Sequence, residues 1–589
     1  MIRGIYIVIF IVNAICASSQ NAIKLHIVLK SGDKKAFKNI VFQPVLLDSL
    51  QLSQELNHVL TQLNKQSYLA ANGDLLKLQP DSFLYQINTG NSFKAIFVKS
   101  DNTTEWFADK VGFEQINDRQ FNYNDWVVKQ EQLLSLLDEN GFPFAQIFLD
   151  SIEVEDDLIK AHINIVKNKM ILFDSIELIG KANISKTFLK NYLGIKQGEL
   201  YNEKLIKNAN QRLYELAYIK VLKSPAIYFF GNKARPLFYL DNKKASSADG
   251  IIGIAPTSSQ NNKLVLTGDF NLKLQNILGS GKSFDLSYRS FLGNSQDLNL
   301  KFNYPYFLGT KFGLDYGLKI LKYDTAFVNV QNDFALQYRF IGSDYIKVYY
   351  SLQQSTLLSV DTLNIKNNRQ LPGVNDIRSD FYGIAVRKSK LDYFINPKRG
   401  FTFDLDFAAG SKNIIRNNTI NILRVSDNQG NIYNLYDSIK LNVFQIRFIA
   451  NVEKYYHLFS SNVLKTSFNA GFLKSSNIFF NELFRIGGLK TLRGFDEQSI
   501  FASQYGILNI EWRYLIQQNS NFVLFWNGAW YKNEGRKPSI SDTPWGAGLG
   551  LNIETGSGIF SLYYATGKQF DNPLEFRSAK IHFGFINYF

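Results

Sequence analysis

The chain has 589 residues, more than the ~100 to 200 residues of a typical domain, so we expect at least two structural parts. Hydrophobic residues make up 45% and charged residues 20% of the chain, a balance that excludes a disordered protein. Aromatic residues reach 15%, which favours β-strands. The net charge is 65 − 51 = +14, but no nucleic-acid-binding motif accompanies it, and we expect no nucleic-acid partner.

Residues 1–20 are predicted to be an export signal. Arg3 precedes the apolar run 5–12, and small residues follow at 17–19. Removal of this segment would also remove Cys16, the only cysteine, and with it any disulfide or thiol nucleophile. A lipoprotein signal is disfavoured, because an isoleucine precedes Cys16 where a small residue is normally required. No later stretch reaches the ~18 apolar residues of a membrane-spanning helix, so a membrane-crossing form requires a closed β-barrel.

The first part of the mature chain is predicted to hold three α+β modules. In the clearest of them a helix begins at the N-cap Ser185 and ends by Gly194, and a second helix with one apolar face follows Asn202. The same order of helix, turn and strands recurs twice before it, more weakly. An unrelated α+β domain is the alternative. The predicted boundaries are 21–95, 96–168 and 169–244.

The remaining residues, 245–589, alternate between apolar and polar positions as strands do. Many of these runs have ten or more residues, which exceeds the ~5 to 6 residues of soluble strands and suits a tilted membrane strand. Short and long connections alternate, as periplasmic turns and outer loops do in bacterial barrels. Sixteen strands are predicted, at 247–255, 263–275, 282–292, 297–305, 311–323, 327–340, 345–354, 380–392, 400–409, 438–452, 462–473, 505–516, 521–531, 545–553, 558–567 and 579–589.

The most specific motif is Phe484-Arg-Ile-Gly-Gly-Leu-Lys-Thr-Leu-Arg-Gly-Phe495, in the sixth predicted outer loop. With the modules and the barrel pattern, it resembles the superfamily of outer-membrane assembly factors that includes BamA and TamA. The resemblance covers nearly the whole mature chain. It implies α+β periplasmic POTRA modules followed by an all-β, sixteen-stranded antiparallel transmembrane barrel, in the outer membrane of a Gram-negative bacterium.

The resemblance also implies roles for individual residues. In the family, the motif arginine folds back into the barrel lumen and meets acidic groups on strands 12 and 13. The predicted partners of this arginine are Glu511 on strand 12 and Asn527 on strand 13, where many relatives carry Asp. A lone loop arginine is more often solvated, but the glycine pair, the loop position and Glu511 together favour the family role. The motif residues carried over are Gly487, Gly488, Arg493, Gly494 and Phe495.

The seam between the first and last strands is the predicted site of insertion. Strand 1 is short and contains Gly250 and Gly253, and Gly584 lies in strand 16. Glycine weakens a strand, and an edge with unpaired backbone groups can template a new strand. The terminal Phe589 is similar to the aromatic residue that ends a barrel assembly signal, although Asn587 is polar where that signal prefers an apolar residue.

The function implied by the resemblance is non-enzymatic. The modules would receive unfolded outer-membrane protein clients, the seam would help them enter outer-membrane lipid, and periplasmic or lipoprotein accessory subunits are possible partners. One alternative is a two-partner secretion pore, although that family typically has two modules and a plug helix. Another is a passive or structural barrel.

No catalytic, metal or cofactor site is predicted. The five histidines include no pair at metal-binding spacing, and no Gly-x-Ser-x-Gly motif is present. The segment 279–283 resembles the end of a phosphate-binding loop, but it lacks the first glycine and joins two predicted strands. We therefore interpret it as a periplasmic turn.

Overall fold

The computed structural model describes residues 23–93, 95–100, 119–156, 158–256, 264–291, 295–426, 429–489, 491–536, 538–555, 558–570 and 579–588. The predicted export signal 1–20 and the terminal Phe589 lie outside these residues. The chain divides into two compact units, and each is described by itself. The first comprises Met1–Ile171 with Leu200–Glu203, and the second comprises Leu172–Glu199 with Lys204–Phe589.

The first unit contains two α/β modules of similar design, each with a parallel central strand pair and a long helix on the sheet. Both helices start at a side-chain cap: Asp48 accepts from the Gln51 N–H, and Asn122 from the Asp125 N–H. The sheet orders are β2-β1-β4-β3 and β6-β5-β8-β7. The elements are β1 (Ile23–Ser31), α1 (Lys34–Lys38), β2 (Val45–Leu46), α2 (Ser49–Lys65), β3 (Asn72–Gln79) and β4 (Ser82–Asn88), then β5 (Ala95–Ser100), β6 (Arg119–Phe121), α4 (Tyr123–Glu139), β7 (Gln146–Glu155) and β8 (Leu158–Val166).

A third module opens the second unit, and its first helix has the predicted ends. The Ser185 hydroxyl accepts from the Phe188 N–H at 3.0 Å, and Gly194 ends the helix in the left-handed conformation. The exact boundaries of the three modules stay predictions. The elements are β9 (Leu172–Phe173), β10 (Glu177–Ile179), α5 (Lys186–Leu193), α6 (Glu203–Tyr214), β11 (Ile219–Phe230) and β12 (Lys233–Asn242).

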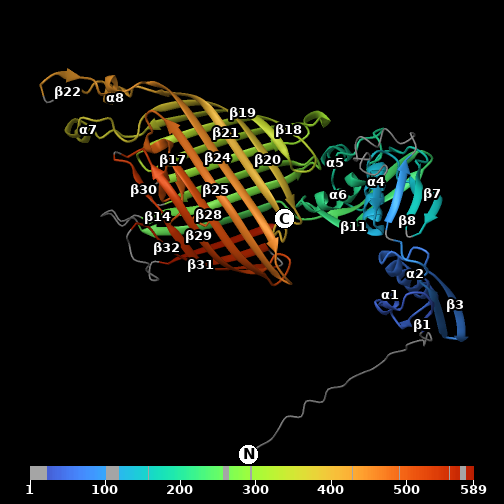
Figure 1. The fold of residues 1–589 in the computed structure, drawn as a ribbon. Helices are drawn as coiled ribbons and strands as arrows, with labels where there is room; N and C mark the ends of the chain where they lie inside the picture. The colour runs from blue at the N-terminus through green and yellow to red at the C-terminus, as the bar shows by residue number, and fades with distance from the viewer. Residues whose placement is uncertain are drawn as a thin grey trace, which may run out of the picture. The chain divides into compact units, whose positions relative to one another are not determined.

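The barrel follows, with strands joined in chain order and closed by its first and last strands (Figure 1). The predicted number of sixteen is confirmed, because β30 and β31 both pair with β29 and together form one strand. The strands are β13 (Ser247–Pro256), β14 (Leu264–Ile277), β15 (Lys282–Phe291), β16 (Ser295–Tyr304), β17 (Phe312–Tyr323), β18 (Phe327–Arg339), β19 (Tyr345–Leu357), β20 (Ile377–Leu391), β21 (Gly400–Ile414), β24 (Asn442–His457), β25 (Asn462–Ser475), β28 (Gln504–Leu515), β29 (Asn521–Asn533), β30 (Ile540–Asp542), β31 (Trp545–Thr555), β32 (Gly558–Lys568) and β33 (Lys580–Tyr588).

Several strand ends differ from the prediction. β21 continues to Ile414 instead of ending at 409, and β24 begins at Asn442 rather than at 438. The ladder between these two strands persists beyond the stretch that alternates cleanly, because backbone pairing does not require an apolar outer face. Among the described residues, none of the helices combines the length and apolarity needed to cross a membrane.

The long outer loops carry structure of their own. The fourth, fifth and sixth outer loops share a small apolar core that includes Ile365, Tyr436 and Phe479, all buried. The sixth outer loop, residues 476–503, contains a short hairpin. The loop elements are α7 (Thr362–Asn368), α8 (Asn418–Asn421), β22 (Val425–Ser426), β23 (Ile432–Tyr433), η4 (Leu435–Ser438), η5 (Phe480–Glu482), β26 (Phe484–Ile486) and β27 (Ile500–Ala502).

The third module contacts the turns at one end of the barrel within the second unit. The Ser185 N–H donates to the Gly279 carbonyl at 2.7 Å, and the Gly342 N–H donates to the Tyr192 carbonyl at 2.7 Å. The Asn191 side chain donates to the carbonyl of Gly309, in the 3-10 turn η3 (Phe307–Gly309), at 2.8 Å. The segment 279–283 is thus a turn that joins β14 and β15, as interpreted from the sequence, and the module binds it.

Candidate functional site: the sixth outer loop and the barrel seam

The glycine pair of the sixth outer loop allows a sharp turn after β26. Gly487 and Gly488 have φ angles of +112° and +99°, in the left-handed region that disfavours other residues. A Cβ atom on Gly487 would lie 2.6 Å from the carbonyl oxygen of Asp496, and one on Gly488 would overlap the Glu497 carboxylate. Close packing against the backbone therefore requires glycine at Gly487, and at Gly488 the left-handed backbone conformation favours it.

The tight turn leads to Arg493, whose side chain is buried against strands β28 and β29. Its Nη2 atom lies 2.9 Å from Glu511 Oε1 and 2.9 Å from Asn527 Oδ1. Its guanidinium also lies 3.8 Å from the centre of the Phe525 ring, a cation–π geometry. Arg493, Glu511 and Asn527 are 6%, 7% and 0% exposed. The structure thus brings together the loop arginine and both of its predicted partners.

Gly494 and Phe495 rest on a glycine-rich part of the barrel wall that the sequence reasoning missed. A Cβ atom on Gly546 would overlap the Arg493 carbonyl oxygen, and one on Gly567 would lie 2.8 Å from the Phe495 ring. Gly494 itself has φ +95° and lies against the backbone at 566. The available signal was the repeat of glycine at alternate positions 546, 548 and 550, which leaves the first half of one face of β31 without side chains.

A second arginine on Glu511 was also missed. Arg513 Nε and Nη2 lie 2.9 and 2.6 Å from Glu511 Oε2, so each carboxylate oxygen has its own cation. Since Asn527 is neutral, the Glu511 carboxylate is the ion-pair partner of both Arg493, which is buried, and Arg513, which is half-buried. Glu511 and Arg513 are two apart on β28, so they lie on the same face of the strand and their side chains can meet.

The sixth outer loop has another buried anchor on the far side of its hairpin. Lys412 Nζ lies 2.9 Å from both Glu482 carboxylate oxygens, and these two side chains are 0% and 3% exposed. Glu482 also accepts from the Gln445 side chain and from the Phe479 N–H, each at 2.8 Å. The loop is therefore attached to β21 and β24 as well as to β28 and β29.

The seam is the weakest join among the described barrel strands. Within the described residues, the register between β13 and β33 joins Ser247 with Tyr588 and Ala248 with Asn587, whereas β13 is in register with β14 along its whole length. Strand 1, β13, has 10 residues and is among the shorter strands, but β15 and β16 have the same length. Sparse pairing, not length, sets the seam apart.

The predicted seam glycines do not pair with each other. Gly250 and Gly253 lie in β13 opposite Phe270 and Thr267 of β14, and Gly584 lies in β33 opposite Ser561 of β32. All three therefore belong to the strands that flank the seam. The predicted terminal signal residue Phe589 lies outside the described residues.

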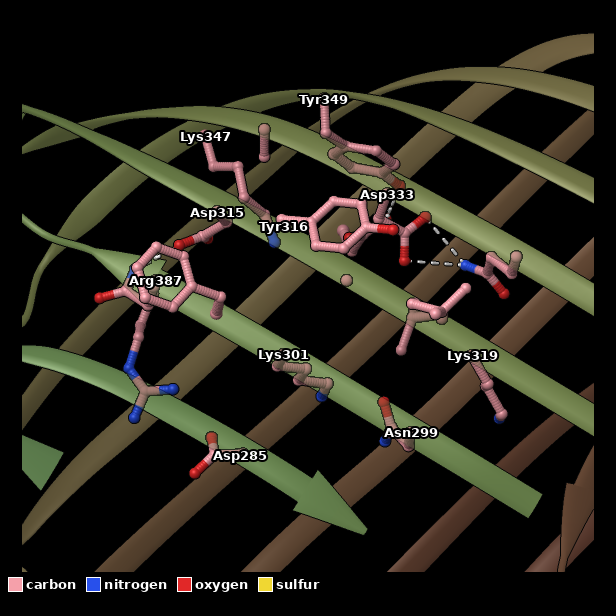
Figure 2. Close-up of a pocket in the computed structure, with 18 of the residues that line it drawn as sticks. Asp285, Asn299, Lys301, Asp315, Tyr316, Lys319, Asp333, Lys347, Tyr349 and Arg387 are labelled. Atoms are coloured by element: carbon pink, nitrogen blue, oxygen red, sulfur yellow. Dashed lines mark hydrogen bonds between the residues drawn. The ribbon is translucent and has the colours of Figure 1, made fainter. Parts of the chain in front are cut away.

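The barrel encloses a polar cavity of about 980 Å³, shown in Figure 2. Acidic and basic side chains alternate along neighbouring strands, as with Asp285 opposite Lys301. Asp333 accepts from the Gln331 side chain at 3.0 Å with each carboxylate oxygen. Such a mixed lining suits water and polar chains better than an apolar ligand. In the described part of the chain, no cluster of metal-ligating side chains is found.

Two family profiles match the chain. The Omp85 superfamily domain matches residues 276–586, and the POTRA profile, described as a surface antigen variable number repeat, matches residues 171–240. No curated protein matches the chain.

The solved structures similar to the chain include two proteins called CdiB. The one from Escherichia coli has a TM-score of 0.54 and 15% identity, covering 92% of this chain and 98% of that chain. The one from Acinetobacter baumannii has a TM-score of 0.51 and 13% identity, with the same coverage of 92% and 98%. BamA from Haemophilus ducreyi lacking POTRA domains 1-3 has a TM-score of 0.41 and 15% identity, covering 85% and 99%. At these identities the likeness shows the fold alone.

Proposed function

The chain belongs to the Omp85 superfamily, and from this premise we propose that it inserts outer-membrane proteins at the seam between β13 and β33. The family consists of transport and assembly proteins, not enzymes, and its members handle client proteins. The barrel lies in the bacterial outer membrane with the POTRA modules in the periplasm. The finer proposal is that clients are unfolded outer-membrane proteins that enter lipid through the seam.

The sparse pairing of the seam is the observation that carries this proposal. Apart from the two register pairs at one end, the described part of β33 has no strand partner on its β13 side. Unpaired N–H and C=O groups at a strand edge can pair with an incoming strand. Opening this join also costs less than opening any neighbouring ladder, because fewer backbone hydrogen bonds break.

In this proposal the sixth outer loop stabilises the barrel while a client is inserted at the seam. Arg493 ties the loop to β28 and β29 through Glu511 and Asn527. Gly487, Gly488, Gly494 and Phe495 let the loop reach that position. Buried pairs of this kind keep one arrangement of the loop, because removing either partner leaves a charge in a poorly solvated place.

The modules at 21–95, 96–168 and 169–244 are proposed to receive the clients before insertion. Each sheet ends in an edge strand, β3, β7 or β11, that has one free side in the described fold. An extended client segment can add to such an edge by main-chain hydrogen bonds. Periplasmic or lipoprotein accessory subunits remain possible partners in this proposal.

A disulfide across the seam tests the function. The lock joins one cysteine in residues 250–254 of β13 to one in residues 581–586 of β33, the part of the seam without register pairs among the described residues, with the register found by scanning in a Cys16→Ser background. A matched control places Leu300→Cys with Leu318→Cys between β16 and β17, which are already fully paired. We expect the seam lock to block insertion of a client barrel into vesicles, and reductant to restore it, while the control lock has no effect.

The same experiment separates the alternatives. An export pore that passes one partner through the lumen, or a passive or structural barrel, would tolerate the seam lock. If a complete seam crosslink leaves client insertion at the wild-type rate, lateral insertion by this protein is wrong.

A further inference from the structure

The turn that follows the loop motif carries two adjacent carboxylates that reach different strands. Asp496 Oδ1 lies 2.8 Å from Lys580 Nζ, at the start of β33. Glu497 Oε1 lies 3.3 Å from Arg289 Nη1, near the end of β15. Because β33 and β15 lie on opposite sides of the seam, one short turn of the sixth outer loop spans it.

The contacts on the β15 side continue into the barrel wall. Arg289 Nε donates to Asp269 Oδ1 of β14 at 2.8 Å, so the guanidinium bridges β14 and the loop. Glu497 is itself fixed by the N–H of Leu489, at 3.3 Å from Oε2. Charged groups therefore form an unbroken series from Lys580 on one side of the seam to Asp269 on the other.

These ion pairs lie at the end of the seam where strand pairing is absent among the described residues. The register pairs of the seam involve residues 247–248 and 587–588, at the opposite end of β33 from Lys580. Backbone pairing thus holds one end of the seam, and the loop carboxylates hold the other.

We propose that Asp496 and Glu497 form an electrostatic latch that keeps the outer end of the seam closed between insertion events. The latch proposal rests on the proposed insertion at the seam, and it assigns the residues that control when the seam opens. The side chains of Asp496 and Lys580 are 72% and 38% exposed, and those of Glu497 and Arg289 are 40% and 28% exposed. Exposed ion pairs are weak and screened by salt, so the latch can open without unfolding the loop.

Distances across the seam test the latch without any client. Spin labels at Tyr288→Cys on β15 and Ile581→Cys on β33 report the separation in lipid nanodiscs, in the full chain with Cys16→Ser. We expect Asp496→Asn with Glu497→Gln to increase the ratio of open to closed seams about twofold to thirtyfold. Charge exchange, Asp496→Lys with Lys580→Glu, should restore the closed distances relative to Asp496→Lys alone.

A matched control removes an ion pair away from the seam. Glu534 contacts Lys474 and Lys532 on β25 and β29, at 3.3 and 2.7 Å. Glu534→Gln should leave the label distances unchanged. High salt should open the wild-type seam but have little further effect on the neutralised double variant. Unchanged distances in the double variant, or an equal change in Glu534→Gln, would overturn the latch.

Client insertion then tests the function separately. If the double variant opens the seam and raises the rate of client insertion into vesicles, both proposals are supported. If it opens the seam but insertion stays at the wild-type rate, the latch stands and the proposed insertion function is contradicted.

Discussion

The sixth outer loop is attached to two regions of the barrel by ion pairs of opposite character. On the continuous wall, the side chains of Lys412 and Glu482 are 0% and 3% exposed, whereas at the seam those of Lys580 and Asp496 are 38% and 72% exposed. Removing one partner of a buried ion pair leaves an uncompensated charge and strongly destabilises the fold. Exposed ion pairs contribute little and are screened by salt. The same loop is thus fixed firmly to the continuous wall and only weakly to the strand at the seam.

The largest effect is expected from breaking the buried wall anchor. Lys412→Met leaves the Glu482 carboxylate buried without its cation, which should reduce the free energy of unfolding by about 3 to 5 kcal/mol. Thermal unfolding in detergent, followed by heat-modifiable gel migration, measures this. Lys474→Met, which breaks an exposed pair, should change stability by only about 0.5 kcal/mol. Equal losses in the two variants would contradict the contrast between buried and exposed anchors.

A smaller loss is expected at the motif arginine. Arg493→Ala removes a charged hydrogen bond to Glu511, worth about 1.5 to 3 kcal/mol, but leaves Arg513 on the same carboxylate. The same gel assay and client insertion measure the result, with Arg493→Lys as the variant that keeps the charge. Unchanged gel migration together with unchanged insertion in Arg493→Ala would remove the proposed role of this residue.

A third prediction concerns pH at the contact between the third module and the barrel. Burial raises the pKa of Glu215 from its ordinary 4.5 to about 6, although the nearby Arg212 opposes the shift. The folded state therefore binds this proton more tightly than the unfolded state. Its contribution to stability, about 2 kcal/mol, is full below pH 4.5 and is lost as the pH rises through about 6.

Comparison with Glu215→Gln isolates this contribution, because other carboxylates titrate in the same range. The difference in free energy of unfolding between wild type and variant should change between pH 4 and pH 7 in the stated direction, as measured by denaturant titration. A pH-independent difference would show that Glu215 does not titrate in this window.

The smallest effect is expected at the neutral partner of Arg493. Asn527→Asp keeps the acceptor and adds a charge between two guanidinium groups and one carboxylate, so we expect a stability change within about 1 kcal/mol. Gel migration and insertion should stay near wild type. A severe assembly defect would mean that the buried site cannot accept a second carboxylate.

Much of the fold was predictable because the environment of a membrane strand imposes alternation. The sixteen strands follow from that alternation, whereas the family and the outer-membrane location were implied by the resemblance that the motif at 484–495 carries. Strand ends were less predictable, since ladders continue beyond the lipid. β21 shows this, because it continues to Ile414, beyond the predicted end at 409. The reverse error occurs at 438–441, where the residues alternate without pairing in the barrel.

The candidate site was only partly predictable. Arg493, Glu511 and Asn527 were found because the motif and strand parity both indicate them. Lys412 and Glu482 were not, because charges 70 residues apart in outer segments look the same as solvated ones until the loop is folded. The acidic turn after the motif was missed for the same reason, since its partners lie on strands at the two ends of the barrel sequence.

The barrel contacts of the third module described above lie on one side of the seam. The module binds the turns after β14, β16 and β18, through Gly279, Gly309 and Gly342. These turns belong to the half of the barrel that begins with β13. A force applied to this module would therefore act first on the strands that follow β13, on one side of the seam, while β33 on the other side is bound through Asp496 of the loop.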